Sequence, residues 1–169
     1  MLKDSSAKTL ENLKEAFAGE SQANRKYLAF AAKANTEGYT QVARLFRAAA
    51  DAETVHALAH LKAMGGIKST KENVEAAVGG ETFEFKSMYP AMIEQARTDV
   101  EDEAEMSFTN ANAVEKIHAG LYQKYLDSMS NLVAVDIYVC QVCGNTVEGS
   151  APDMCPICAS PKDKFKKID

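Results

Sequence analysis

Apolar residues recur at helical spacing along most of the chain, and this pattern predicts four long helices. Polar residues fill the remaining positions of each pattern, as expected for helices that bury one face. Pro90 lies inside the third pattern and is expected to bend that helix or to loosen its hydrogen bonding nearby. The predicted helices run from Ser5 to about 35, from about 39 to 64, from Glu81 onward, and from about 100 to 131.

A long connection separates the second predicted helix from the third. Ser69-Thr-Lys-Glu72 resembles a capping box, in which a serine side chain and a glutamate three residues later satisfy the first amides of a helix. We therefore expect a short helix over 70–78, ended by Gly79-Gly80. A long crossover of this kind is typical of ferritin-like four-helix bundles.

The character of the sequence changes after the fourth helix. Residues 132–136 read as a linker and 137–139 as a short strand, and the remainder is rich in Gly, Pro and Cys. We predict two domains, a helical domain over 1–133 and a small C-terminal domain over 134–169.

The pattern Phe-x6-Glu-x-x-His-Ala occurs twice. The first copy carries Glu53 and His56, and the second carries Glu115 and His118. Side chains three residues apart project from the same side of a helix, so each copy offers a carboxylate and an imidazole together. Two such helices provide half of the ligands of a carboxylate-bridged dimetal centre, and each of the other two helices adds a glutamate.

The other helices hold suitable glutamates. Glu20 precedes Glu53 by 33 positions and Glu81 precedes Glu115 by 34, the spacing of a helical hairpin. Several buried like charges are very unfavourable without a cation, so a metal is implied, and oxygen ligands with two imidazoles suit iron or manganese. The candidate ligands are Glu20, Glu53, His56, Glu81, Glu84, Glu115 and His118. Tyr27 and Tyr89 lie in ligand-bearing helices and are candidates to hydrogen-bond ligand carboxylates.

All four cysteines lie near the C-terminus, in two Cys-x-x-Cys pairs: Cys140 with Cys143, and Cys155 with Cys158. Each pair forms a tight turn that aims two thiolates at one point, and two turns complete a tetrahedral S₄ site for zinc or iron. With iron the site is a one-electron carrier, whereas with zinc it is structural.

The net charge of −5 and the lack of a basic stripe argue against nucleic acid as a partner. No stretch approaches the roughly 20 apolar residues of a membrane helix, and no signal peptide is evident. Cysteines grouped for metal binding agree with a reducing compartment. We therefore expect a cytoplasmic protein that does not bind membranes.

With both motifs in view, the chain resembles rubrerythrins over essentially its whole length. The resemblance rests on Phe17-Ala-Gly-Glu20-Ser-Gln-Ala, Ala52-Glu53-Thr-Val-His56-Ala57, Gly80-Glu81-Thr-Phe-Glu84 leading to Met88-Tyr89-Pro90, Glu115-Lys-Ile-His118-Ala, and the four-cysteine tail. It implies a mainly α fold, a ferritin-like bundle followed by a small rubredoxin-like domain. Ala159 stands where free rubredoxins usually carry a second glycine.

The resemblance implies a role for each ligand. Glu53 and Glu115 would bridge two irons, Glu20 and Glu81 would be terminal ligands, and His118 would bind one iron. The other iron would exchange Glu84 for His56 on reduction. The four cysteines would hold a mononuclear iron, with zinc as the alternative metal.

The resemblance also implies a non-haem di-iron peroxidase, which reduces hydrogen peroxide to water with electrons relayed through the C-terminal iron. The sequence lacks a Gly-x-Gly-x-x-Gly fingerprint for a nicotinamide or flavin, so an external donor must supply the electrons, either rubredoxin or an NAD(P)H-dependent reductase. Members of the family form homodimers with electron transfer between subunits, and the short linker agrees with that arrangement.

Two other functions stay open at this point. The bundle would also suit a ferroxidase or iron-handling protein, although a shell-forming ferritin has no use for an electron-carrying tail. A non-enzymatic helical bundle with a structural zinc ribbon is the second alternative.

Overall fold

The structure is a computed structural model that describes residues 7–169. The chain divides into two compact units, Met1–Lys68 and Ser69–Asp169, which are described separately. The predicted start of the first helix at Ser5 lies outside the described residues. None of the helices within 7–169 combines the length and apolar character that crossing a membrane requires.

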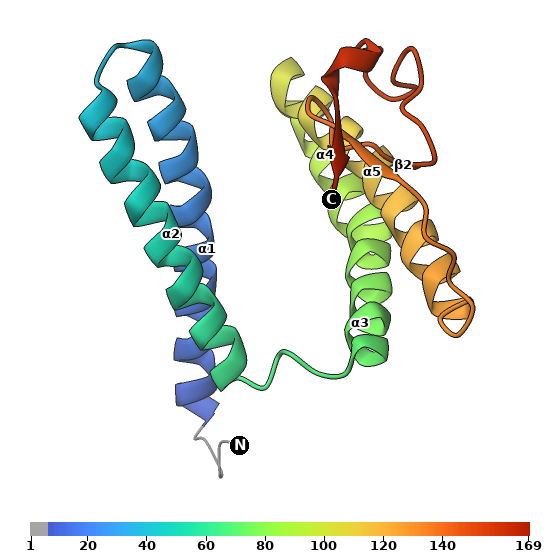
Figure 1. Ribbon diagram of the computed structural model, residues 1–169, viewed down its shortest axis with the longest axis horizontal. Coiled ribbons are helices and arrows are strands. Elements are labelled where there is room, and N and C mark those ends of the chain that lie inside the picture. Colours follow the sequence, from blue (N-terminus) through green and yellow to red (C-terminus); the bar gives the residue numbers. More distant parts are fainter. Residues whose placement is uncertain (1–6) are drawn as a thin grey trace. The chain divides into compact units, whose positions relative to one another are not determined.

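The first unit is a helical hairpin formed by α1 (Ala7–Thr36) and α2 (Thr40–Ala63) (Figure 1). Gly38 adopts a φ of 84° in the turn between them, a left-handed conformation that glycine tolerates without strain. Alanines spaced by seven residues on α2 are buried: Ala43, Ala50 and Ala57. Their small side chains form a stripe that lets the two helices pack closely.

Asn24 is a buried polar residue that joins the two helices of the hairpin. Its Nδ2 donates hydrogen bonds to the carbonyl oxygen of Ala50 at 2.6 Å and to Thr54 Oγ1 at 2.8 Å. A buried hydrogen bond of this kind is lost if one helix slides along the other, so Asn24 sets their register. This register places Glu20 of α1 beside Glu53 of α2.

The second unit begins with one helical rod instead of the two predicted helices. The rod comprises α3 (Thr70–Phe83), the π-helical segment η1 (Glu84–Met88) and α4 (Tyr89–Asp99). The capping box of Ser69 and Glu72 is confirmed. The predicted break at Gly79-Gly80 is wrong, because α3 runs through both glycines. Packing of α3 against α5 (Asp102–Asp127) outweighs the roughly 1 kcal/mol that each helical glycine costs relative to alanine.

The predicted disturbance near Pro90 is confirmed by the π-helical segment. The backbone N–H of Tyr89 donates to the carbonyl oxygen of Glu84, five residues earlier. Proline lacks an N–H group and its ring clashes with the carbonyl four residues before it, so the regular α pattern is disfavoured here. The segment begins at Glu84, a predicted metal ligand.

The C-terminal part of the second unit is a small antiparallel sheet with strand order β2-β1-β3. The strands are β1 (Ile137–Cys140), β2 (Thr146–Glu148) and β3 (Phe165–Ile168), with a 3₁₀ turn η2 (Lys162–Lys164) before β3. We call residues 137–168 the four-cysteine module. The mainly α fold with a small C-terminal module that carries four cysteines is confirmed. The position of the domain boundary near residue 133 stays a prediction.

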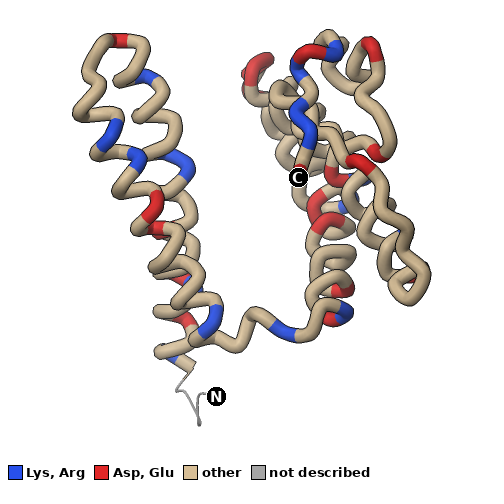
Figure 2. The backbone as a smooth tube through the Cα atoms, in the orientation of Figure 1, with Lys and Arg blue, Asp and Glu red and all other residues tan. Residues whose placement is uncertain are grey.

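Charged residues of both signs occur along the helices. Figure 2 shows acidic and basic positions interspersed in each unit, without a continuous basic stripe in the described part of the chain. The long helices therefore present mixed surfaces, and the chemistry of the molecule lies in a few clusters of acids, histidines and cysteines.

Candidate metal centres

The first unit brings three predicted ligands together. Glu20 comes from α1, and Glu53 and His56 come from α2, and each offers a ligand atom within 4.8 Å of the other two. His56 Nδ1 lies 2.9 Å from Glu53 Oε2. Hydrogen bonds from His56 and from Glu20 lower the pKa of Glu53, which favours its charged, ligating form.

The second unit forms a matching trio. Glu81 of α3 meets Glu115 and His118 of α5, again with ligand atoms within 4.8 Å. His118 Nδ1 lies 2.7 Å from Glu115 Oε2 and 3.8 Å from Glu81 Oε2. Burial, together with a hydrogen bond to Glu115, raises the pKa of Glu81 to about 7. Two carboxylates this close repel each other unless a proton or a cation lies between them.

Glu84 and Tyr89 belong to the surroundings of this second trio. Burial raises the pKa of Glu84, and the negative charge of Glu115 raises it further. Burial and the charges of Glu115, Glu84 and Glu81 raise the pKa of Tyr89, so its phenol stays protonated and able to donate a hydrogen bond. Glu84 is thus an additional carboxylate beside the two carboxylates of the trio.

The donor set fits a hard or borderline cation. Each trio supplies carboxylate oxygens and one imidazole, a combination that suits iron or manganese. Partial burial and the neighbouring Glu115 raise the pKa of Glu81, so two ionised carboxylates side by side are unfavourable here, and a bound cation relieves this. The structure brings the predicted ligands together as two trios, each within its own unit, with Glu84 beside the second trio.

The four cysteines form a compact cluster in the four-cysteine module. Their sulfur atoms lie within 4.8 Å of one another, with 3.7 Å between Cys140 and Cys158 and 3.6 Å between Cys143 and Cys155. A tetrahedron with metal–sulfur bonds of about 2.3 Å has edges of about 3.8 Å, so the arrangement fits a single ion. Although burial raises the pKa of Cys158, hydrogen bonds with Ser160 lower it to about 6.

The two cysteine turns are built alike. Gly144 N–H donates to Cys140 O, and Ala159 N–H donates to Cys155 O, both at 2.9 Å. Gly144 has a φ of 83° and Ala159 a φ of 57°. Ala159 therefore occupies the left-handed position that a glycine fills in the first turn, at a cost of roughly 1–2 kcal/mol.

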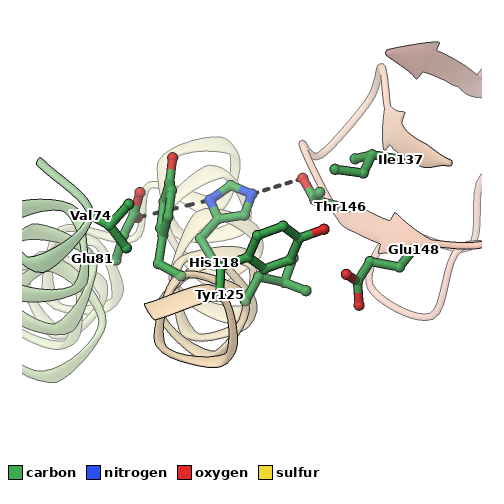
Figure 3. A pocket seen from close by; sticks show the side chains of 9 residues that line it. Val74, Glu81, His118, Tyr125, Ile137, Thr146 and Glu148 are labelled. Atoms are coloured by element: carbon green, nitrogen blue, oxygen red, sulfur yellow. Dashed lines mark hydrogen bonds and ion pairs between the residues drawn. The ribbon is translucent and has the colours of Figure 1, made fainter. Parts of the chain in front are cut away.

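A cavity of about 370 Å³ opens beside the second trio. It lies between α3, α5 and the four-cysteine module, and Figure 3 shows Glu81 and His118 on one side and Thr146 and Glu148 on the other. His118 Nε2 lies 2.9 Å from Thr146 Oγ1. The cavity thus connects a candidate metal ligand with the cysteine-bearing module.

Sequence reasoning missed three residues near the sites. Asn24 aligns the first hairpin, Thr146 contacts His118, and Asn145 is 1% exposed with its Nδ2 donating to Cys155 Sγ at 3.6 Å. The position of Asn24 on the same helical face as Glu20 was the only available signal. Tyr27 packs in an aromatic cluster with Phe30 and Phe46, and its predicted hydrogen bond to a ligand carboxylate stays a prediction.

The helices, the carboxylate–histidine trios and the four-cysteine module define a ferritin-like metalloprotein with an appended rubredoxin-like domain. The "Rubrerythrin" family pattern matches residues 11–126, and "Rubrerythrin, rubredoxin-like domain" matches residues 138–166. The chain belongs to the rubrerythrin family, whose members are typically oxidoreductases. Its four-cysteine cluster and its carboxylate–histidine groups can bind iron.

Named relatives match nearly the whole chain. Rubrerythrin-2 of Clostridium acetobutylicum is 37% identical, over 95% of this chain and 96% of the relative. Nigerythrin of Nitratidesulfovibrio vulgaris is 38% identical, over 93% of this chain and 85% of the relative. Among solved structures, the fully reduced, all-ferrous state of nigerythrin matches with a TM-score of 0.59 at 34% identity, covering 99% of this chain and 92% of that chain.

Proposed function

We propose that the protein is a non-haem di-iron peroxidase that reduces hydrogen peroxide to water. The observation that carries this proposal is the hydrogen-bond contact between His118, a candidate ligand in the bundle, and Thr146, three residues after Cys143 in the four-cysteine module. A metal-binding module in direct contact with a second metal ligand suits the delivery of electrons. Membership of the rubrerythrin family supports the same function.

The residues of the chain have distinct roles in this proposal. Glu53 and Glu115 would bind both irons, Glu20 and Glu81 would be terminal ligands, and His118 would complete the ligand set of one iron. His56 and Glu84 would serve in turn as ligands of the other iron. A bound di-iron centre supplies two electrons, which with two protons convert one hydrogen peroxide to two waters. The phenol of Tyr89 stays protonated and can donate a hydrogen bond to the ligand carboxylates.

The second step of the proposal concerns the supply of electrons. The four cysteines would hold a mononuclear iron, which would supply one-electron chemistry, and the donor would be external, either rubredoxin or an NAD(P)H-dependent reductase. We propose that the protein acts as a homodimer. The resemblance predicts electron transfer between subunits, and the contact between Thr146 and His118 favours transfer within one chain.

The contact between the module and the bundle also bears on the alternatives. A ferroxidase gives electrons to its oxidant without any need for an internal carrier, so it does not explain why Thr146 lies against His118. A structural zinc ribbon does not explain the carboxylate–histidine trios. Removal of one cysteine ligand separates both alternatives from the peroxidase.

The substitution Cys143→Ser tests the peroxidase proposal. We expect it to abolish steady-state turnover with an external donor, because the carrier site loses a ligand. Single-turnover oxidation of the chemically reduced bundle by hydrogen peroxide should remain, and should be faster than oxidation by oxygen. Stopped-flow absorbance measures both reactions. Retained turnover would exclude the relay, and preferential reaction with oxygen would support a ferroxidase.

A further inference from the structure

The four-cysteine module contacts α5 at three points along the helix. A Cβ built on Gly144 would lie 3.7 Å from Cγ1 of the buried Val114. One turn further along α5, His118 Nε2 lies 2.9 Å from Thr146 Oγ1. Beyond it, Lys124 forms an ion pair with Glu148. Val114 and His118 are four residues apart and lie on one side of α5, and the long side chain of Lys124 reaches Glu148 further along the helix, so these contacts fix the module along α5.

The two ring nitrogens of His118 face different partners. Its Nδ1 faces the carboxylates of Glu115 and Glu81, and its Nε2 lies 2.9 Å from Thr146 Oγ1, which also contacts the carbonyl oxygen of Gly144 at 3.1 Å. A neutral imidazole carries one proton, so an imidazole that binds a metal ion through Nδ1 carries that proton on Nε2. The threonine oxygen has two lone pairs and can accept it.

We propose that Thr146 is a positioning residue for His118, in which the threonine hydroxyl accepts the Nε2 proton and leaves the Nδ1 lone pair for a metal ion. This inference rests on the proposed role of His118 as a metal ligand. A ligating imidazole is usually oriented by a partner on its other nitrogen. Here that partner comes from the four-cysteine module, so the module helps to build the metal site of the bundle.

Strand pairing and a neighbouring side-chain hydrogen bond fix the position of Thr146. It is the first residue of β2 and pairs with Val139 of β1, the strand that ends at Cys140. Between Cys143 and Thr146, the Nδ2 of Asn145 donates to Cys155 Sγ at 3.6 Å. The hydroxyl is thus fixed by the same segment that carries two of the cysteines, and its position relative to α5 follows from the contacts of Gly144 and Glu148.

The experiment compares Thr146→Val, which removes the hydroxyl at nearly constant shape, with Thr146→Ser, which keeps it. Zinc-loaded, full-length protein labelled with ¹⁵N-histidine is studied by NMR. In the wild type and Thr146→Ser, we expect His118 in the Nε2–H form with slow solvent exchange. In Thr146→Val, that proton should exchange faster, and the affinity of the bundle for zinc should fall about 10- to 100-fold.

The control is Thr98→Val, which removes a hydroxyl that donates to the carbonyl oxygen of Glu94 within α4 at 3.0 Å. It should alter neither the histidine signal nor the zinc affinity. Unchanged exchange and affinity in a folded Thr146→Val protein would overturn the positioning role while leaving the peroxidase proposal intact. A wild-type bundle that binds no metal would overturn both. If Thr146→Val does not fold, loss of the slow Nε2 proton in Thr146→Ser would overturn the inference.

Discussion

Glu81 and Glu115 illustrate how a single site can favour a metal before any metal is bound. Their side chains are only 21% and 17% exposed, and burial together with the neighbouring carboxylate raises the pKa of Glu81 to about 7. Near neutral pH, Glu81 therefore holds a proton part of the time. A divalent cation replaces that proton and stabilises both carboxylates at once.

Glu115→Ala should therefore remove the metal from the bundle, because a proposed bridging ligand is lost. We expect the affinity for iron to fall by more than the roughly 10- to 100-fold that accompanies loss of an outer partner of a ligand. Elemental analysis should show iron at the cysteines alone, with their visible absorption unchanged. Glu103→Ala, which alters an exposed acid of the same helix, is the control. An unchanged iron content would remove Glu115 from the ligand set.

Spacing along the sequence predicts ligands more readily than the residues that hold them. Glu53 and His56 are three residues apart in one helix, so their proximity follows from helical geometry alone. Thr146 and His118 are 28 residues apart, with a non-helical connection between α5 and β1. Their contact depends on how the module packs against α5, and no local sequence pattern predicts that packing. The aromatic packing of Tyr27 likewise depends on a second helix.

Among the elements, the π-helical segment is the one most closely connected with function. It spans Glu84–Met88 and ends directly before Tyr89 and Pro90. One additional residue in a helical turn rotates the side chains before it by about 100° relative to those after it. The segment therefore determines how Glu81 and Glu84 are oriented relative to the part of the rod that follows.

Pro90→Ala should allow a regular α-helix in this region. We expect the free energy of unfolding to rise by as much as about 3 kcal/mol, because alanine removes the clash and restores the backbone N–H group. The metal content of the bundle should fall, since Glu84 and Tyr89 would turn relative to each other. Differential scanning calorimetry and elemental analysis measure the two effects. Pro152→Ala, in a loop of the four-cysteine module, should not change the metal content of the bundle, and a fully loaded Pro90→Ala protein would contradict this role.

The boundaries of the elements were predictable where capping and turn residues agree with the helical period. Ser69 and Glu72 begin α3 as expected, and Gly38 lies in the turn after α1. Gly79-Gly80 was misleading, because the low helix propensity of glycine is a local signal and the packing of α3 against α5 overrides it. The disturbance at Pro90 was predictable, since its causes, the ring and the missing N–H group, belong to proline itself.

At the scale of the whole molecule, the four-cysteine module and α5 act as one structure. The ion pair between Lys124 and Glu148 and a hydrogen bond between Tyr125 and Glu148 lower the pKa of Glu148, so its carboxylate stays charged in mildly acidic solution. Together with the contact between Thr146 and His118, they attach the module to the helix that carries two of the proposed iron ligands. In the proposed function, an electron at the cysteines would therefore have a short path to α5 of the same chain.

Heterodimers that combine a Cys143→Ser chain with a Glu115→Ala chain test this path. In such a dimer, the only intact four-cysteine site and the only intact Glu115 belong to different chains. We expect no steady-state peroxidase activity, because the contact between Thr146 and His118 joins the module to its own α5. Two affinity tags allow the co-expressed heterodimer to be purified, and the wild-type dimer prepared in the same way is the control. Activity near half of the wild-type value would instead establish electron transfer between subunits, and failure to isolate any heterodimer would contradict the proposed dimer.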